Sequence, residues 1–179
     1  MVNLVIENIV ATANLHQKLN LDEISCMLPA ASFDPSENPT MVYRFDEVHG
    51  AVLLAANGKI SCTGTKTLVD AEECINFVVN ELQNHDVSVE QPVTKIDTVV
   101  ATASFDQTVS LELIAKELQQ QKIILPSEET AWLTYHYDEH LSILFFTSGK
   151  MVFTGRKNPA QLSNILETLK DTLSSTGVI

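Results

Sequence analysis

The sequence Gly50-Ala-Val-Leu-Leu-Ala-Ala-Asn-Gly-Lys-Ile-Ser-Cys-Thr-Gly-Thr-Lys66 decides the fold, because it occurs twice. The second copy reads Leu141-Ser-Ile-Leu-Phe-Phe-Thr-Ser-Gly-Lys-Met-Val-Phe-Thr-Gly-Arg-Lys157. Each copy is an apolar run, an x-Gly pair (Asn57-Gly58 or Ser148-Gly149) and a second run that closes on Thr-Gly. An x-Gly pair between apolar runs is a strong hairpin signal, since Gly tolerates positive φ. We therefore predict two hairpins, each with a two-residue turn.

The duplication extends over the rest of the chain. Lys59 and Lys150, which follow the turn glycines, are 91 residues apart, whereas the matching stretches 9–13 and 99–103 are 90 apart. The second copy has therefore gained one residue, which we place between about 115 and 131. Self-similarity of this kind indicates repeats. We predict two tandem repeats, over 1–90 and 91–179, which pack as one pseudo-symmetric body.

Each repeat has the same predicted order of strands and helices. Residues 2–13 alternate and are rich in β-branched side chains, which is typical of a strand. Helices are predicted where apolar residues recur at helical spacing after a capping residue such as Asn20, Asp22 or Asn158. The predicted helices are 21–29, 67–84, 110–120 and 158–173, and the other predicted strands are a short one near 33 and strands over 41–45, 94–104 and 131–137. The result is an α+β fold of two β-α-β-β-β-β-α repeats, each an antiparallel sheet backed by two helices.

Composition excludes several classes of protein. The 179 residues are 45% hydrophobic, and no apolar run approaches the roughly 20 residues of a membrane span. We see no signal peptide. The cysteines Cys26, Cys62 and Cys74 lack metal-binding spacing and are interpreted as buried reduced thiols, which suits the cytoplasm. No phosphate loop, nucleophile elbow or carboxylate pair is present, and the histidines are scattered, so we expect no catalysis, cofactor or metal.

The formal charge of −12 argues against a general polyanion binder, because non-specific nucleic-acid affinity comes from Lys and Arg. The basic residues are, however, concentrated in part of the chain, which leaves room for a localised nucleic-acid site. Six of the eleven basic residues fall in the strand-rich stretches 41–66 and 132–157: Arg44, Lys59, Lys66, Lys150, Arg156 and Lys157. Charged residues at the margin of any sheet would give the same pattern.

With these motifs, the chain resembles the TATA-box-binding protein family, and archaeal members more than eukaryotic ones. The motifs are Glu-Asn-Ile-Val-Ala-Thr (7–12), Tyr-Arg (43–44), the Gly-Lys and Thr-Gly words of 57–66, and Ser-Gly-Lys-Met-Val-Phe-Thr-Gly-Arg-Lys (148–157). The resemblance implies a saddle with a pseudo-twofold axis. Its curved antiparallel sheet would lie on the DNA minor groove, with the helices on the convex side.

The resemblance also implies DNA contacts at matching positions. Asn8 and Val10 match groove-facing residues, and Thr98 and Val100 are their counterparts, so the second Asn is lost. The other groove-facing matches are Leu53, Thr63, Leu144, Val152 and Thr154, while Ser61 replaces the partner of Val152. Arg44, Lys59, Lys66, Lys150, Arg156 and Lys157 would meet phosphates. Thr and Asn suit A·T steps, whose minor groove offers only acceptors.

The sequence departs from the family at its phenylalanine wedges. The family is itself a standard example of apolar side chains that insert between base steps and kink the duplex. It uses two Phe pairs, one per repeat. Phe146 is retained, but Asn38, Ala55 and Glu129 stand at the other three positions, with Trp132 close to the last of them. We expect a smaller, one-sided bend.

Two functional hypotheses remain. The first is a general transcription factor that binds A·T-rich double-stranded promoter DNA and recruits a transcription factor B-like protein through Glu128 and Glu129. The second is a divergent paralogue that acts as a protein-interaction module with weak or no DNA binding. The hairpin motifs favour the first hypothesis, whereas the lost wedges and the charge favour the second. We also expect a homodimer through the concave face when DNA is absent, and a cytoplasmic, nucleoid-associated location if the chain is archaeal.

Overall fold

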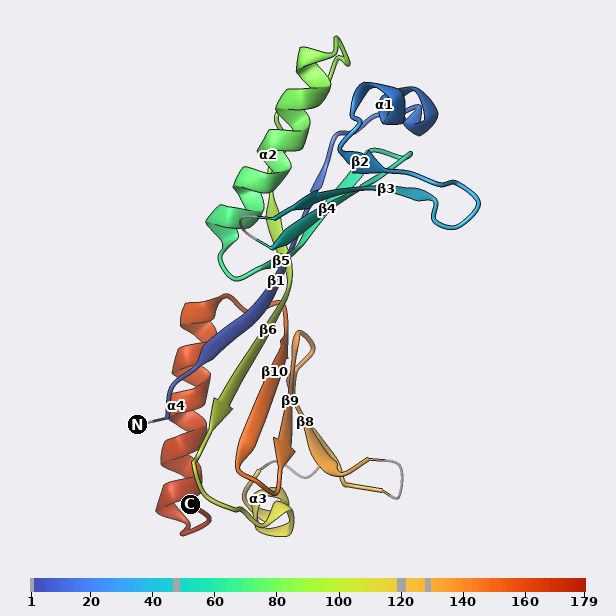
Figure 1. Cartoon of the computed structure of the whole chain (residues 1–179). Coiled ribbons are helices and arrows are strands. Elements are labelled where there is room, and N and C mark those ends of the chain that lie inside the picture. The colour runs from blue at the N-terminus through green and yellow to red at the C-terminus, as the bar shows by residue number, and fades with distance from the viewer. Residues whose placement is uncertain (1, 47–48, 119–121, 128–129) are drawn as a thin grey trace. The chain divides into compact units, whose positions relative to one another are not determined.

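The computed structural model describes residues 2–46, 49–118, 122–127 and 130–179, which form two compact units (Figure 1). Unit 1 comprises Met1–Glu7 and Thr98–Ile179, and unit 2 comprises Asn8–Asp97. Strands and helices follow one another in the predicted β-α-β-β-β-β-α order twice, so the α+β fold and the internal repeat are confirmed.

Unit 2 holds the first set of elements. These are most of β1 (Val5–Asn14), then α1 (Leu21–Met27), β2 (Ala31–Ser32), β3 (Thr40–Phe45), β4 (Gly50–Ala55), β5 (Lys59–Thr65) and α2 (Leu68–Asn84). The strand order is β2-β3-β4-β5-β1, and the registered pairs are antiparallel. The long helix α2 packs on β4 and β5. One face of the sheet is therefore covered by helix.

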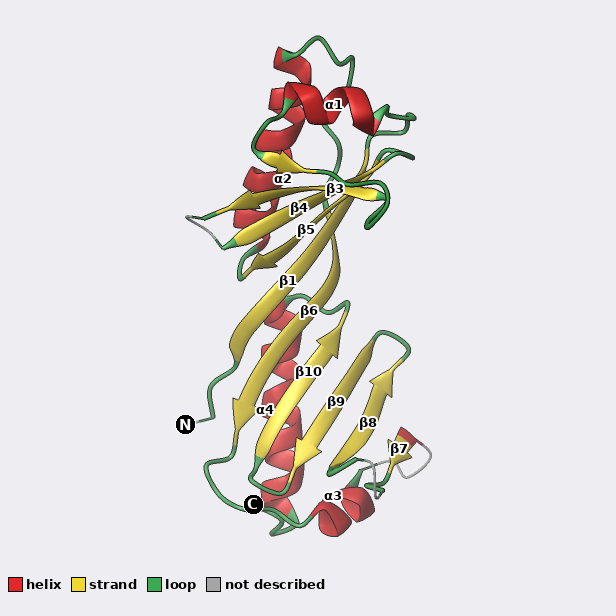
Figure 2. Ribbon diagram, turned by 45° about the vertical axis from the view of Figure 1, so that its right-hand side comes forward, coloured by secondary structure: helices red, strands yellow, loops and turns green. Residues whose placement is uncertain are grey.

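Unit 1 repeats this arrangement with the second set. Its elements are the start of β1, then β6 (Lys95–Ser104, from Thr98 onward), α3 (Leu111–Glu117), β7 (Ile123–Ile124), β8 (Trp132–Asp138), β9 (Leu141–Phe146), β10 (Lys150–Gly155) and α4 (Pro159–Ser175). The order β6-β10-β9-β8-β7 mirrors that of unit 2. Figure 2 shows α4 running behind the strands of this sheet.

The two hairpins form where predicted, but their connections have three residues, not two. Residues 56–58 join β4 to β5, and residues 147–149 join β9 to β10. The third residue of each loop is Gly at positive φ, +82° in Gly58 and +83° in Gly149. A three-residue hairpin places its glycine in this left-handed position. A Cβ at either glycine would also collide with a backbone carbonyl, that of Gln17 or Gln107.

Strand pairing changes the alignment of the two repeats. The first residue of β2 lies three positions after Leu28, whereas the first residue of β7 lies five positions after its counterpart Leu118. Between β8 and β9 the second repeat is shorter by one, because Ala51 lies seven positions after Arg44 and Ser142 lies six after His136. A single insertion was predicted, since sequence matching shows only the net difference. The counterpart of Asn38 is consequently Thr130, and that of Thr40 is Trp132.

Local signals account for the helix boundaries. The side chain of Asn20 accepts a hydrogen bond from the Glu23 N–H, and that of Asn158 accepts one from Gln161, whose own side chain completes a capping box. Pro159 occupies the first turn of α4, where its missing N–H is tolerated. None of the helices in the described ranges is long and apolar enough to cross a membrane.

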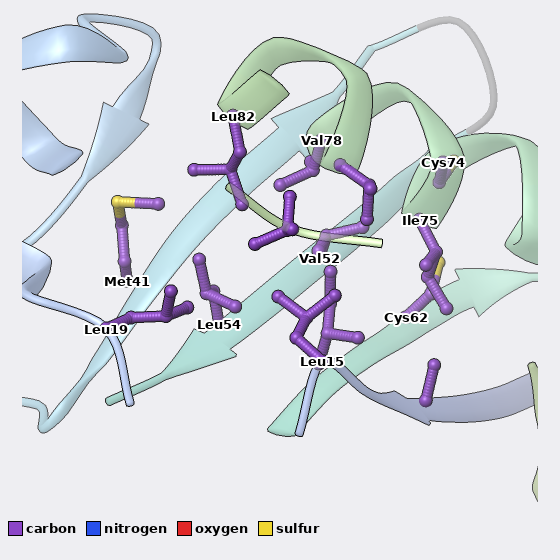
Figure 3. Packing of buried hydrophobic residues seen from close by; sticks show 14 of the residues in the cluster. Leu15, Leu19, Met41, Val52, Leu54, Cys62, Cys74, Ile75, Val78 and Leu82 are labelled. Atoms are coloured by element: carbon purple, nitrogen blue, oxygen red, sulfur yellow. The ribbon is translucent and has the colours of Figure 1, made fainter. Parts of the chain in front are cut away.

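The core of unit 2 lies between its sheet and α2. Met41, Val52, Leu54 and Cys62 from the strands meet the buried side chains of α2, including Cys74 and Ile75 (Figure 3). Cys62 and Cys74 are buried as predicted, but Cys26 is exposed, because it lies on the solvent side of the short helix α1. Burial raises the pKa of the Cys62 thiol to about 12, which keeps that thiol protonated and unreactive.

Candidate nucleic-acid interface

Each sheet has a second face, which we call the open face, made of the strand residues that point away from the long helix. In β1 the residues Ile9, Ala11 and Ala13 are buried, whereas Asn8, Val10 and Thr12 between them are only half-buried. The same alternation runs through β4 and β5 and through β9 and β10. Successive side chains of a strand point to opposite faces. The predicted groove-facing residues therefore lie on the open faces.

Strand register aligns these side chains in matching rows. In unit 2 one row crosses all five strands: Ser32, Val42, Leu53, Ser61 and Thr12. In unit 1 the equivalent row is Ile124, Thr134, Leu144, Val152 and Thr102. Each row is a strip of aliphatic side chains and hydroxyls that carries no charge.

A second row lies beside the first in each unit. In unit 1 it runs His136, Ser142, Thr154 and Val100, and His136 Nδ1 is 2.9 Å from Ser142 Oγ. In unit 2 it runs Arg44, Ala51 and Thr63 and continues to Asn8, because the Asn8 amide donates to Thr63 Oγ1 at 3.3 Å. The backbone N–H of Gly64 donates to Asn8 Oδ1 at 2.8 Å. These two bonds fix the orientation of the Asn8 amide.

The predicted basic residues divide into two groups. Arg44, Lys59 and Lys150 share the open-face parity of their strands and are exposed. Lys66, Arg156 and Lys157 follow the ends of β5 and β10. All six therefore border the uncharged rows, three within strands and three just beyond them.

Lys157, one of these cations, is paired with a carboxylate. Lys157 Nζ lies 2.6 Å from Asp138 Oδ2. Burial acts to raise the pKa of Asp138, but the hydrogen bonds from Lys157 and from the His140 N–H outweigh it and hold that pKa below its ordinary value. The Asp138 carboxylate is thus ionised at neutral pH and offsets the charge of Lys157.

An aromatic pair marks one end of the open face of unit 1. Trp132 on β8 is directly opposite Phe146 on β9, with ring centroids 6.0 Å apart and planes tilted by 44°. The same pair of positions in unit 2 holds Thr40 and Ala55. The open faces therefore match in their rows but differ at this end.

Several open-face residues were not predicted from the sequence, and two predicted residues lie outside the described part of the chain. Thr12, Val42, Thr102, Thr134 and Ser142 complete the rows and could have been found by counting every second residue from those predicted. Glu128 and Glu129, predicted to bind a partner, lie outside the described residues. No cluster of three or more His, Cys, Asp or Glu side chains arranged to hold a metal occurs within the described ranges.

Two copies of a one-sided antiparallel sheet, backed by helices and joined in one chain, define a class of internally duplicated α+β proteins. Comparison with known proteins identifies the family within this class. The model of the family "Transcription factor TFIID (or TATA-binding protein, TBP)" matches residues 3–85 and 93–176, one match per repeat. The chain belongs to the TATA-box-binding protein family.

Individual relatives agree with this assignment. TATA-box-binding protein B of Halobacterium salinarum is 34% identical over 97% of this chain and 95% of its own length. The TATA-box-binding protein of Picrophilus torridus is 31% identical over 100% of this chain and 98% of its own. Among solved structures, the Methanococcus jannaschii TATA-box-binding protein has a TM-score of 0.81 and 30% identity, and the match covers 97% of this chain and 99% of that one. The predicted resemblance to archaeal members is confirmed.

Proposed function

We propose that this chain is a general transcription factor of the TATA-box-binding type, which binds A·T-rich duplex DNA in the minor groove through its open faces. The observation that carries the proposal is the pair of matching uncharged rows. In each row two adjacent aliphatic side chains, Val42 and Leu53 or Leu144 and Val152, are flanked on both sides by a hydroxyl. In the minor groove an A·T pair presents only the acceptors A N3 and T O2, and G·C adds an amino donor. Hydroxyl donors and methyl groups suit a groove floor without that amino group.

Asn8 and Thr63 are proposed to supply the central polar contacts. Gly64 occupies the amide oxygen of Asn8, so the amide nitrogen is directed to Thr63 and retains a second hydrogen for a base acceptor. The Thr63 hydroxyl, which accepts this bond, can donate its own hydrogen. A donor pair fixed before binding loses little entropy on contact. Thr98 and Thr154 occupy the matching positions of the second repeat and offer hydroxyls without an amide.

The proposed electrostatic contribution is modest. Six cations border the rows, and Asp138 already neutralises Lys157. For each phosphate that a cation neutralises, log K falls by about 0.9 for every tenfold rise in salt concentration. The slope of log K against log salt should therefore be no steeper than about −5. The net charge of −12 then disfavours binding to duplexes that lack a fitting groove.

The first experiment compares fluorescence anisotropy titrations of an A·T-rich and a G·C-rich duplex at several salt concentrations. Thr63→Val and Thr154→Val each remove one donor and should weaken A·T binding about tenfold. Thr168→Ala, on the exposed side of α4, is the matched control and should leave affinity unchanged. Equal affinity for both duplexes, or no effect of the two Val variants, would contradict groove recognition.

The aromatic residues at one end of the open face bear on how the bound DNA is bent. Trp132 and Phe146 present two rings at one end of the open face, whereas Thr40 and Ala55 present none. We infer that insertion between base steps, which costs a few kcal/mol of unstacking per step, occurs at the Trp132–Phe146 end only. Energy transfer across an end-labelled A·T-rich duplex would report the bend. Trp132→Ala and Phe146→Ala should each reduce it, and Ala55→Phe should change it less; a bend that survives both alanine variants would place the wedges elsewhere.

We further infer a transcription factor B-like partner that contacts Glu128 and Glu129, and self-association through the open faces when DNA is absent. Replacing both glutamates with Lys should abolish capture of that factor on a DNA-bound complex while leaving DNA affinity intact.

Sedimentation without and with duplex tests the self-association through the open faces, since DNA should convert dimers to monomers.

The alternative function is a protein-interaction module with weak DNA binding. The net charge of −12 and the lack of aromatic side chains at Thr40 and Ala55 favour it. The same titration separates the two functions. An absence of A·T-selective binding even at low salt would leave the interaction module as the better account.

A further inference from the structure

An aromatic cluster lies on the helix-covered side of unit 2, away from the open face. Phe77 of α2 meets Tyr43 and Phe45 of β3, with ring centroids 5.6 and 5.5 Å away, and these two rings are 4.9 Å apart. Tyr43 and Phe45 are half-buried, but Phe77 is 43% exposed. Rings that are fixed in place and open to water offer apolar area at little cost in side-chain entropy.

Phe77 stands in the middle of an acidic stripe, in which Glu73 is exposed and Glu81 is half-buried and accepts a hydrogen bond from Asn84 Nδ2. Val69, Glu73, Phe77 and Glu81 are spaced by four residues, so they share one face of α2. Val69 is 60% exposed. The helix carries Asp70, Glu72, Glu73 and Glu81 and contains no Lys, Arg or His. We name Val69, Glu73, Phe77 and Glu81, together with Tyr43 and Phe45, the α2 face.

The second repeat provides an internal comparison, because α2 and α4 are both 17 residues long and occupy equivalent places. Five of the six buried positions of α2 correspond to the buried positions of α4: Ala71, Cys74, Ile75, Val78 and Leu82 match Leu162, Ile165, Leu166, Leu169 and Leu173. The stripe does not correspond, since α4 has Ala160, Asn164, Thr168 and Thr172 there. A helix in this place therefore packs well without an exposed aromatic or an acidic flank, and packing does not explain the α2 face.

We propose that the α2 face is a docking surface for a basic protein segment that inserts a large apolar side chain beside Phe77 between Lys or Arg residues. Charge complementarity identifies the partner: Glu73 and Glu81 flank the ring one helical turn away on each side. An aromatic centre with a polar rim is the usual anatomy of a binding hot spot. A second copy docked through the same face is disfavoured as the occupant, because Glu73 and Glu81 of one copy would oppose those of the other. The surface would work while the open face holds DNA.

The test uses the full chain and a labelled amphipathic peptide of about 15 Lys and Leu residues, with a Glu and Leu peptide of equal length as the acidic probe. The basic peptide should bind and the acidic one should not. Phe77→Thr, which installs the residue of α4, should weaken binding at least about tenfold. E73N/E81T should weaken it and flatten its salt dependence. Unchanged melting temperatures show that the variants remain folded.

Two control variants distinguish this surface from general attraction to an acidic protein. E112Q/E117Q removes two exposed charges from α3, and Leu113→Thr removes an exposed leucine from the same helix; both should leave affinity unchanged. Installing the stripe on α4 with N164E/T168F/T172E, beside Tyr135 and Tyr137, should raise the peptide stoichiometry from one to two. The proposal fails if Phe77→Thr has no effect or if E112Q/E117Q weakens binding as much as E73N/E81T. It also fails if sedimentation shows Phe77-dependent self-association, which would make a second copy the occupant.

Discussion

Among single residues, Thr65 is buried on β5 with a hydroxyl that has no hydrogen-bond partner within the described part of the chain. An unsatisfied buried hydroxyl lowers stability, because it loses its hydration without compensation. Thr65→Val keeps the shape and removes the hydroxyl. It should raise the free energy of unfolding by about 1 kcal/mol in urea denaturation.

A nearby threonine supplies the control for this substitution. The Thr67 side chain accepts a hydrogen bond of 3.0 Å from the Asp70 N–H at the start of α2. Thr67→Val removes this cap and should lower the free energy of unfolding by about 1 kcal/mol. If both variants shift stability in the same direction, the hydroxyl of Thr65 has a partner that this account lacks.

The cysteines give a second prediction at this scale. Cys26 is exposed, whereas burial raises the pKa of both Cys62, to about 12, and Cys74. Iodoacetamide should add one group to the native protein at pH 8 and three after unfolding, as counted by mass spectrometry. Two or three additions to the native protein would contradict the burial.

The same pKa shift predicts how stability depends on pH. Above about pH 8.5 the unfolded Cys62 thiol ionises, while the folded one stays protonated until about pH 12. The folded state then binds more protons than the unfolded state, so stability should fall as pH rises through this window. Cys62→Ala should flatten that decline, although the cavity it leaves lowers stability at every pH.

At the scale of elements, the ends of β8 and β10 are joined by the ion pair between Asp138 and Lys157. The lowered pKa of Asp138 means that the pair is intact above the ordinary Asp value of about 3.9, and that its contribution is lost as pH falls below it. At neutral pH the carboxylate therefore competes with any phosphate for Lys157.

Asp138→Asn should release Lys157 and strengthen DNA binding. If Lys157 then neutralises one more phosphate, the slope of log K against log salt should steepen by about 0.9. Glu139→Gln removes the same charge one residue away and is the control, with a smaller effect on the slope. An unchanged slope in Asp138→Asn would show that Lys157 does not reach the phosphates.

For the whole molecule, much of the fold could be predicted because its signals are local. Gly58 and Gly149 mark the hairpins, Asn158 and Pro159 begin the last helix, and alternation in β1 shows which side chains share a face. Non-local features could not be predicted in the same way. The register that opposes Trp132 to Phe146 depends on two changes in length that nearly cancel in the sequence.

The candidate site also combines features that could be predicted from the sequence with features that could not. Its residues could be placed on one face by counting in twos, but the pairing of Lys157 with Asp138 and the fixed amide of Asn8 depend on contacts between strands. The α2 face was not predicted, although the four-residue spacing of Val69 and Phe77 with Glu73 already places both apolar residues outside the buried stripe of the helix. The exposed fractions of Val69 and Phe77 agree with that placement.

If the open faces recognise the minor groove of A·T-rich DNA, a base pair that changes only the major groove should leave affinity unchanged. Replacing each A·T pair of a bound duplex by inosine·cytosine gives the major groove of G·C but a minor groove without the amino donor. Anisotropy titrations should give similar affinities for the A·T and inosine·cytosine duplexes and an affinity for the G·C duplex lower by at least about tenfold. If the inosine·cytosine duplex instead binds as weakly as the G·C duplex, recognition lies outside the minor groove and the account is wrong.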